Sequence, residues 1–110
     1  MSEVIVSRKG EKIKAFEING IISNLLLKTD ILEAVLTTFE IGATKGLIRH
    51  LGHEVHIILQ GEVLAEINGK EYSLSEGDVI CFPSILTHAI RNTGKERVIL
   101  FSISTPPTYI

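Results

Sequence analysis

Residues 42–61 read GATKGLIRHLGHEVHIILQG and place three of the chain's four histidines within seven positions. The fourth, His88, lies in residues 77–92, which read GDVICFPSILTHAIRN. Both segments contain runs of branched and apolar residues of the kind that favour β-strands. In a strand, residues i and i+2 share a face, so Glu54 and His56 point to the same side. We expect the two segments to form the two halves of one site.

The length and composition of the chain indicate one globular domain. It has 110 residues, of which 45% are hydrophobic, and this length buries roughly two-thirds of the unfolded surface. The net charge is −2 with both signs interspersed, so we expect no nucleic-acid or membrane partner. The single cysteine cannot form an internal disulfide, and no apolar run resembles a signal or a membrane span. A cytoplasmic protein is the expectation.

Short alternating segments separated by turn signals predict an all-β barrel or sandwich. Asn19-Gly20 and Asn68-Gly69 are typical of tight hairpin turns, and Pro83 suits an edge strand. Residues 31–36 also have helical propensity, but the following threonines and phenylalanine favour a strand. Besides the strand that carries Glu54, the expected strands are 13–18, 21–28, 31–41, 62–67, 70–74, 79–82, 88–92 and 98–104.

The two histidine segments resemble the two motifs of the cupin superfamily. The first motif, G-x5-H-x-H-x3-E-x6-G, is matched except that its first histidine position is Ile48. The second, G-x5-P-x-G-x2-H-x3-N, is matched except that Ile85 replaces its internal glycine. The resemblance implies a double-stranded β-helix, or jelly-roll, over residues 1–110 as one domain. Within it, residues 31–104 form the motif-bearing barrel and residues 1–28 supply N-terminal strands. The matching positions are Gly42, His50, Glu54, Gly61, Gly77, Pro83, His88 and Asn92.

Cupins typically hold one transition metal inside the barrel, and the resemblance implies His50, Glu54 and His88 as its ligands. Two histidines and a carboxylate suffice for a divalent ion such as Fe, Mn, Ni or Zn. His56 faces the same side as Glu54, so it is a candidate auxiliary ligand or proton carrier in catalysis. It could instead simply hydrogen-bond Glu54. Because Ile48 stands at the first motif histidine position, the alternative that the barrel holds no metal stays open.

Two functions therefore remain open from the sequence. One is metal-dependent oxidation or isomerisation of a small polar molecule, and the other is metal-free binding of a sugar or small acid by a sensing module. Whether the protein is an enzyme is not decided at this level. The apolar strands before Thr29 need covering, and cupins commonly dimerise, so we expect these strands to pair in a homodimer.

Overall fold

The structure, a computed structural model, describes residues 4–108, and these residues form β-strands and connecting turns without any helix. The all-β fold expected from the sequence is confirmed, and the segment with helical propensity forms part of a strand. The strands are β1 (Lys14–Ile18), β2 (Ile21–Lys28), β3 (Glu33–Phe39), β4 (Thr44–Ile48), β5 (His53–Gln60), β6 (Glu62–Ile67), β7 (Lys70–Ser75), β8 (Val79–Pro83), β9 (His88–Asn92) and β10 (Val98–Thr105).

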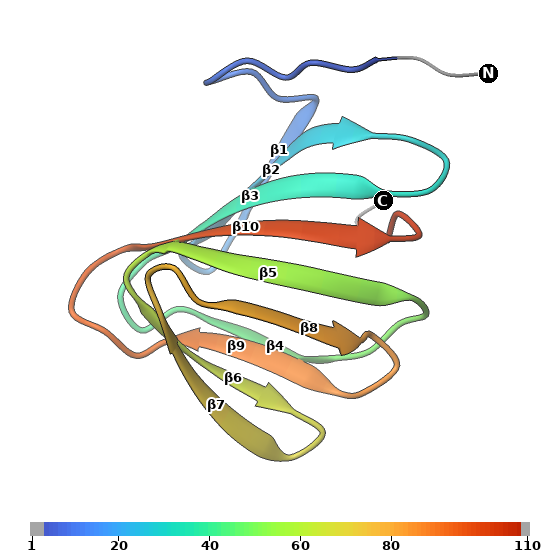
Figure 1. Cartoon of the computed structure of the whole chain (residues 1–110). Helices are drawn as coiled ribbons and strands as arrows, with labels where there is room; N and C mark the ends of the chain where they lie inside the picture. Colours follow the sequence, from blue (N-terminus) through green and yellow to red (C-terminus); the bar gives the residue numbers. More distant parts are fainter. Residues whose placement is uncertain (1–3, 109–110) are drawn as a thin grey trace.

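The strands make two antiparallel sheets that face each other (Figure 1). The larger sheet has the order β1-β2-β3-β10-β5-β8, and the smaller has the order β4-β9-β6-β7. β8 is an edge strand that ends at Pro83, as a residue without a backbone N–H requires. Both residues of the Asn68-Gly69 turn have positive φ angles, 51° and 82°, which is the backbone of a type I′ hairpin.

The N-terminal strands continue the larger sheet. β2 pairs along β3, and its Ile21 and Leu25 point into the core, so this strand is part of the barrel wall. β1 pairs with β2 and forms the edge of the sheet opposite to β8. Residues 4–12 precede it without strand pairing and run beyond β1, away from the barrel (Figure 1). The expected dimer contact therefore maps to one edge of the larger sheet.

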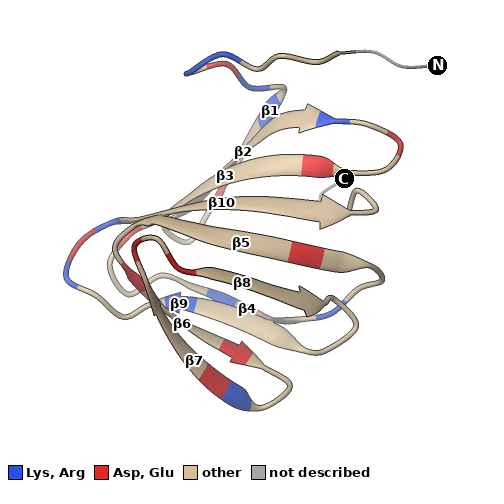
Figure 2. Cartoon of the chain, viewed as in Figure 1, with Lys and Arg blue, Asp and Glu red and all other residues tan. Residues whose placement is uncertain are grey.

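Figure 2 shows that basic and acidic residues are interspersed along the strands and loops. None of the described residues belongs to a helix that is long and apolar enough to cross a membrane.

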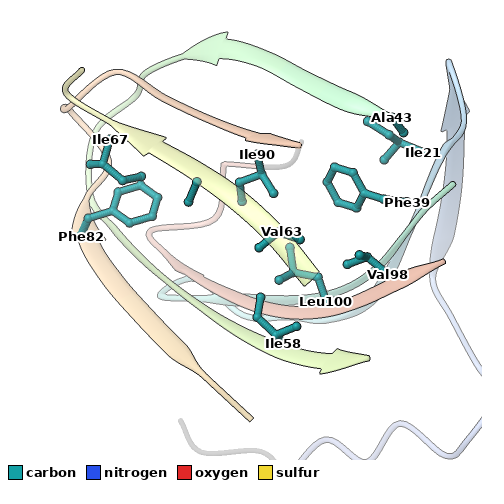
Figure 3. Close-up of a cluster of buried hydrophobic side chains, with 11 residues drawn as sticks. Ile21, Phe39, Ala43, Ile58, Val63, Ile67, Phe82, Ile90, Val98 and Leu100 are labelled. Atoms are coloured by element: carbon teal, nitrogen blue, oxygen red, sulfur yellow. The ribbon is translucent and has the colours of Figure 1, made fainter. Parts of the chain in front are cut away.

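The core fills the space between the two sheets (Figure 3). In the strands that line the core, buried and more exposed positions alternate, because alternate side chains of a strand point to opposite faces. β5 shows this pattern: Ile58 is fully buried, whereas Ile57 and Leu59 on the other face are partly exposed. The buried cluster consists of Ile21, Phe39, Ala43, Ile58, Val63, Ala65, Ile67, Phe82, Ile90, Val98 and Leu100.

Candidate metal centre

Strand parity places the predicted site residues inside the barrel. Glu54 and His56 on β5 are 5% and 8% exposed, and His88 at the start of β9 is 3% exposed. His50 lies in the β4–β5 loop and is partly buried, whereas His53 is exposed, as expected. The predicted shared face of Glu54 and His56 is the inward face of β5, and His88, Ile90 and Asn92 form the inward face of β9.

Backbone hydrogen bonds fix the loop that carries His50. The His50 N–H donates to the Ser84 carbonyl at 2.9 Å, and the Ser84 N–H donates to the Gly52 carbonyl at 2.7 Å. Gly52 has a φ of +101°, and a Cβ there would collide with the backbone carbonyl of Thr105. Only glycine satisfies both constraints at this position. The loop is thereby held against the β8–β9 connection and the end of β10.

Glu54 is the centre of the polar cluster. His56 Nε2 lies 2.7 Å from its Oε1, and the Ser84 hydroxyl donates to its Oε2 at 2.7 Å. Burial alone would raise the pKa of Glu54. The hydrogen bonds from His56 and Ser84, with the charges of His56 and His88, outweigh that effect and lower the pKa to about 2. Glu54 is therefore a carboxylate at neutral pH.

The imidazoles of His50 and His88 both face the Oε2 atom of Glu54. His50 Nε2 and His88 Nε2 lie 3.1 and 3.2 Å from Glu54 Oε2. Their Nδ1 atoms lie 3.2 Å from the Leu51 carbonyl and 2.7 Å from the Leu86 carbonyl. A carbonyl can only accept, so each Nδ1 carries a hydrogen. Each Nε2 then faces Glu54 with a second N–H when the ring is protonated and with a lone pair when the ring is neutral.

Lone pairs this close to a carboxylate repel one another unless a positive charge lies between them. His88 Nε2 is buried and makes no hydrogen bond, although it lies within ion-pair distance of Glu54. The ligand atoms of His50, Glu54 and His88 all lie within 4.8 Å of one another. A nitrogen–nitrogen–carboxylate set whose rings are oriented by carbonyl groups fits a divalent transition metal ion.

His56 and Ile48, the other two positions considered from the sequence, lie outside the convergent ligand set. His56 touches the opposite carboxylate oxygen, and its Nδ1 lies 2.6 Å from the Ser102 hydroxyl, so both ring nitrogens have partners. It lies outside the convergent set of His50, Glu54 and His88. Ile48, at the first motif histidine position, is 39% exposed and puts an apolar side chain at the wall of the cavity.

The cluster opens into a cavity of about 120 Å³ within the barrel. Figure 1 shows the starts of β3, β5 and β9 and the end of β10 at one end of the barrel, and these segments carry Glu33, Glu54, His88 and Ser104. The cavity is lined by Glu33, Val35, Thr37, Phe39, Lys45, Ile48, His50, Glu54, His56, His88, Ala89, Ile90, Leu100, Ser102, Ser104 and Thr108.

Three polar residues of the site were not identified from the sequence. Ser84 is fully buried against Glu54, and Ser102 on β10 reaches His56 across a strand pair. No local pattern marks a single serine as a partner of a histidine 46 positions away. Glu33 could have been found, because it continues the alternation of Val35 and Thr37 on one face of β3.

An antiparallel two-sheet barrel with a histidine–carboxylate cluster in its cavity defines the class of small β-barrels with an internal candidate metal centre. The chain belongs to the cupin family, since the model of the cupin domain matches residues 35–104. This match and the solved structures described below confirm the jelly-roll barrel that the two motifs implied.

Curated relatives cover part of the chain. The HTH-type transcriptional regulator PuuR of Escherichia coli is 32% identical over 79 residues, which are 71% of this chain and 43% of PuuR. An oxalate-binding protein of Thermotoga maritima is 41% identical over 54 residues, which are 48% of this chain and 45% of that protein. The chain thus spans about half the length of these relatives.

Solved structures share the fold over nearly the whole chain. An RmlC-like cupin from Shewanella frigidimarina superposes with a TM-score of 0.83 at 23% identity, covering 97% of this chain and 96% of its own. A predicted oxalate decarboxylase from Thermotoga maritima gives a TM-score of 0.80 at 25% identity, covering 92% of this chain and 98% of its own.

Proposed function

We propose that this protein holds one divalent transition metal ion through His50, Glu54 and His88 and binds a small polar molecule beside it. The observation that carries the proposal is the convergence of two imidazole Nε2 atoms on Glu54 Oε2, with each Nδ1 facing a backbone carbonyl. Such carbonyl contacts orient histidine ligands and fix their tautomers in metal sites.

A bound ion would act as a Lewis acid that polarises an oxygen atom of the ligand. The surrounding side chains prepare the site for it. His56 and Ser84 hold the two oxygens of Glu54, so the carboxylate does not need to reorganise when an ion binds. Ile48 supplies no donor atom on its side of the cavity, which leaves coordination positions for water or ligand. His56 is the group placed to hold or move a proton, at the Nε2 atom beside Glu54.

The ligand class we propose is a small molecule with an oxygen donor such as a carboxylate. The cavity combines apolar side chains such as Phe39 and Ile90 with polar side chains that can fix the orientation of a small ligand. The similarity to an oxalate-binding protein supports a carboxylate, since such an oxygen is a natural ligand for a metal bound by histidines. Oxidation or isomerisation of that molecule is the reaction class to test once metal is present.

A second candidate is a sensing module that binds its ligand without a metal. Ile48 at a motif histidine position favours it, because the four-donor set of the motif is incomplete. The match to part of a transcriptional regulator also favours a sensing module. In that case His50 and His88 would bind Glu54 as protonated imidazoles, with protons in place of the ion.

Elemental analysis of the tag-free protein distinguishes the two candidates. We expect close to one Fe, Mn, Ni or Zn per chain after reconstitution with each ion, and its loss in a His50→Ala/His88→Ala variant. His53→Ala is the matched control, because His53 is exposed and outside the cluster. A parent protein that takes up no ion under any of these conditions contradicts the metal proposal and leaves the metal-free module.

We also propose that the protein is a homodimer in which the N-terminal strands pair and the outer face of the larger sheet is covered. β1 is an exposed edge strand, and edge strands of this kind pair with other chains unless they are covered. The outer face of the same sheet is apolar from β2 across to β8 and only partly buried in one chain, and two copies related by a two-fold axis would cover it. It includes Ile22, Leu36, Val55, Ile57, Leu59, Val79, Ile99 and Phe101.

A further inference from the structure

Glu33 is a buried carboxylate to which the described residues supply no ion-pair or hydrogen-bond partner. It begins β3, its side chain is 1% exposed, and it lines the cavity. Its Oε1 is buried and makes no hydrogen bond to any described residue. An ionised carboxylate removed from water without a hydrogen bond or a cation is strongly destabilising, so proteins rarely keep one without a use. Glu33 lies outside the proposed set of metal ligands, His50, Glu54 and His88.

The strand register puts Glu33 on the same inner surface as the candidate metal centre. Ser104 of β10 is paired with Glu33 on one side and with Glu54 on the other. The three residues therefore form one row across β3, β10 and β5, and both carboxylates line the same cavity. Their backbones lie two strand spacings apart, about 10 Å. Figure 2 shows the acidic positions of β3 and β5 toward the same end of the sheet.

The two carboxylates differ in what surrounds them. Glu54 has His56, Ser84, His50 and His88 within contact distance. Lys45 also lines the cavity, but no ion pair joins it to Glu33 in the part of the chain that the structure describes. The cavity thus has a metal-binding end whose charge would be positive and, across Ser104, an acidic group that needs a cationic donor.

We propose that Glu33 determines ligand specificity by binding a protonated amine. The ligand class is then a small amino carboxylate, with its oxygen donor at the metal end and its ammonium group at Glu33. An ammonium carries several hydrogen-bond donors and one positive charge, which is what an unpartnered carboxylate lacks. The oxygen-donor end rests on the proposed metal function, whereas the amine end rests on Glu33 alone.

The test compares Glu33→Gln with the parent, using glycine, 3-aminopropanoate and 4-aminobutanoate as probes. Acetate, propanoate and butanoate are their amine-free counterparts. Calorimetry on the metal-reconstituted protein should show at least one amine-bearing probe binding about tenfold tighter than its counterpart, the usual strength of a charged hydrogen bond. The ratio should fall to about one in Glu33→Gln. Glu71→Gln, on the exposed part of β7, is the matched control.

The melting temperature of the ligand-free variants is a second test of the role of Glu33. Glu33→Gln should raise the melting temperature relative to Glu71→Gln, because an unpaired buried charge is removed. If Lys45 were the partner of Glu33 in solution, both Glu33→Gln and Lys45→Gln would lower the melting temperature, and the proposal would be overturned. Equal affinity for amine-bearing and amine-free probes, or binding of neither, would overturn it as well.

Metal content of the same samples separates this proposal from the one it extends. Discrimination for amines in a protein that takes up no metal would leave Glu33 assigned and the metal function refuted. A fully loaded protein without discrimination would refute the role of Glu33 alone.

Discussion

Glu54 illustrates how much one residue organises in this cavity. Its two oxygens receive His56 and Ser84 as hydrogen-bond partners, while His50 and His88 face Oε2 with ring nitrogens. Burial of a carboxylate is unfavourable by itself, and the contacts with His56, Ser84 and His88 reverse its effect on the pKa. The side chain is thereby held ionised and rotationally fixed, which is what a metal ligand requires.

Glu54→Gln tests this residue directly. The amide keeps the size of the side chain but removes the negative charge and one acceptor. Loss of an outer-shell partner typically lowers metal affinity 10- to 100-fold, so loss of a ligand charge should lower it by about 100-fold or more. Titration calorimetry with Mn(II) or Ni(II) measures the change, with Glu71→Gln as control. Unchanged affinity in Glu54→Gln would contradict the assignment.

Ser102 is a positioning residue whose hydroxyl lies 2.6 Å from His56 Nδ1. Ser102→Ala leaves that nitrogen unpartnered, and we expect metal affinity to fall about tenfold through the loosened His56 and Glu54. Stability should fall by about 1–3 kcal/mol. Ser102→Thr restores the hydroxyl and should recover the affinity. A Thr variant no better than the Ala variant would show that bulk, not the hydrogen bond, matters here.

At the scale of elements, Asn92 joins the end of β9 to two other segments. Its Nδ2 lies 3.1 Å from the carbonyls of Phe39 and Glu40 and 2.9 Å from that of Glu96, and its Oδ1 accepts from the Gly94 N–H at 3.0 Å. These contacts make Asn92 a residue that stabilises the end of a strand. The other end of β9 carries His88, so one short strand serves structure and site at opposite ends.

Asn92→Ala should lower the free energy of unfolding by about 2–4 kcal/mol, because buried carbonyls lose their donor. Urea unfolding measures this, and Arg91→Ala is the control, since Arg91 is exposed on the other face of β9. Metal content per folded chain should stay unchanged. A loss below about 0.5 kcal/mol would show that water replaces the amide.

At the scale of the whole molecule, the proposed homodimer explains why so much apolar surface lies outside the barrel. Leu59 and Val79 on the outer face of the larger sheet are 48% and 58% exposed. Residues 4–6 are also exposed and apolar. Single exposed apolar residues are ordinary, but a continuous face of them marks an interaction surface.

A Leu59→Lys/Val79→Lys variant should shift the protein from dimer to monomer in light scattering coupled to size exclusion, because charges would enter the apolar interface. Tyr72→Lys, on the smaller sheet, is the control. Deletion of residues 1–20 should expose apolar surface and change the oligomeric state or solubility. A soluble deletion variant with an unchanged oligomeric state would refute the role of the N-terminal strands.

The sequence by itself determined most of the strands, although not β4, and the shared face of the strand that carries Glu54 and His56. Alternation of side chains is a local steric property of a strand, so Glu54, His56 and Ile58 could be assigned to one face from their spacing. The positive-φ turn at Asn68-Gly69 is equally local. The cupin motifs supplied the rest of the fold, and they named His50, Glu54 and His88 as a set that the structure brings together.

Only the tertiary structure decided what surrounds that set. Ser102 meets His56, and Ser104 links Glu33 to Glu54, through strand pairings between residues far apart in the chain. Such pairings and their register depend on how all the strands bury their apolar faces together, and no local pattern records them. The ring orientations of the histidines depend in the same way on carbonyl groups placed by the folded backbone. The candidate ligand residues could therefore be named from the sequence, whereas the residues that contact them could be named only from the folded structure.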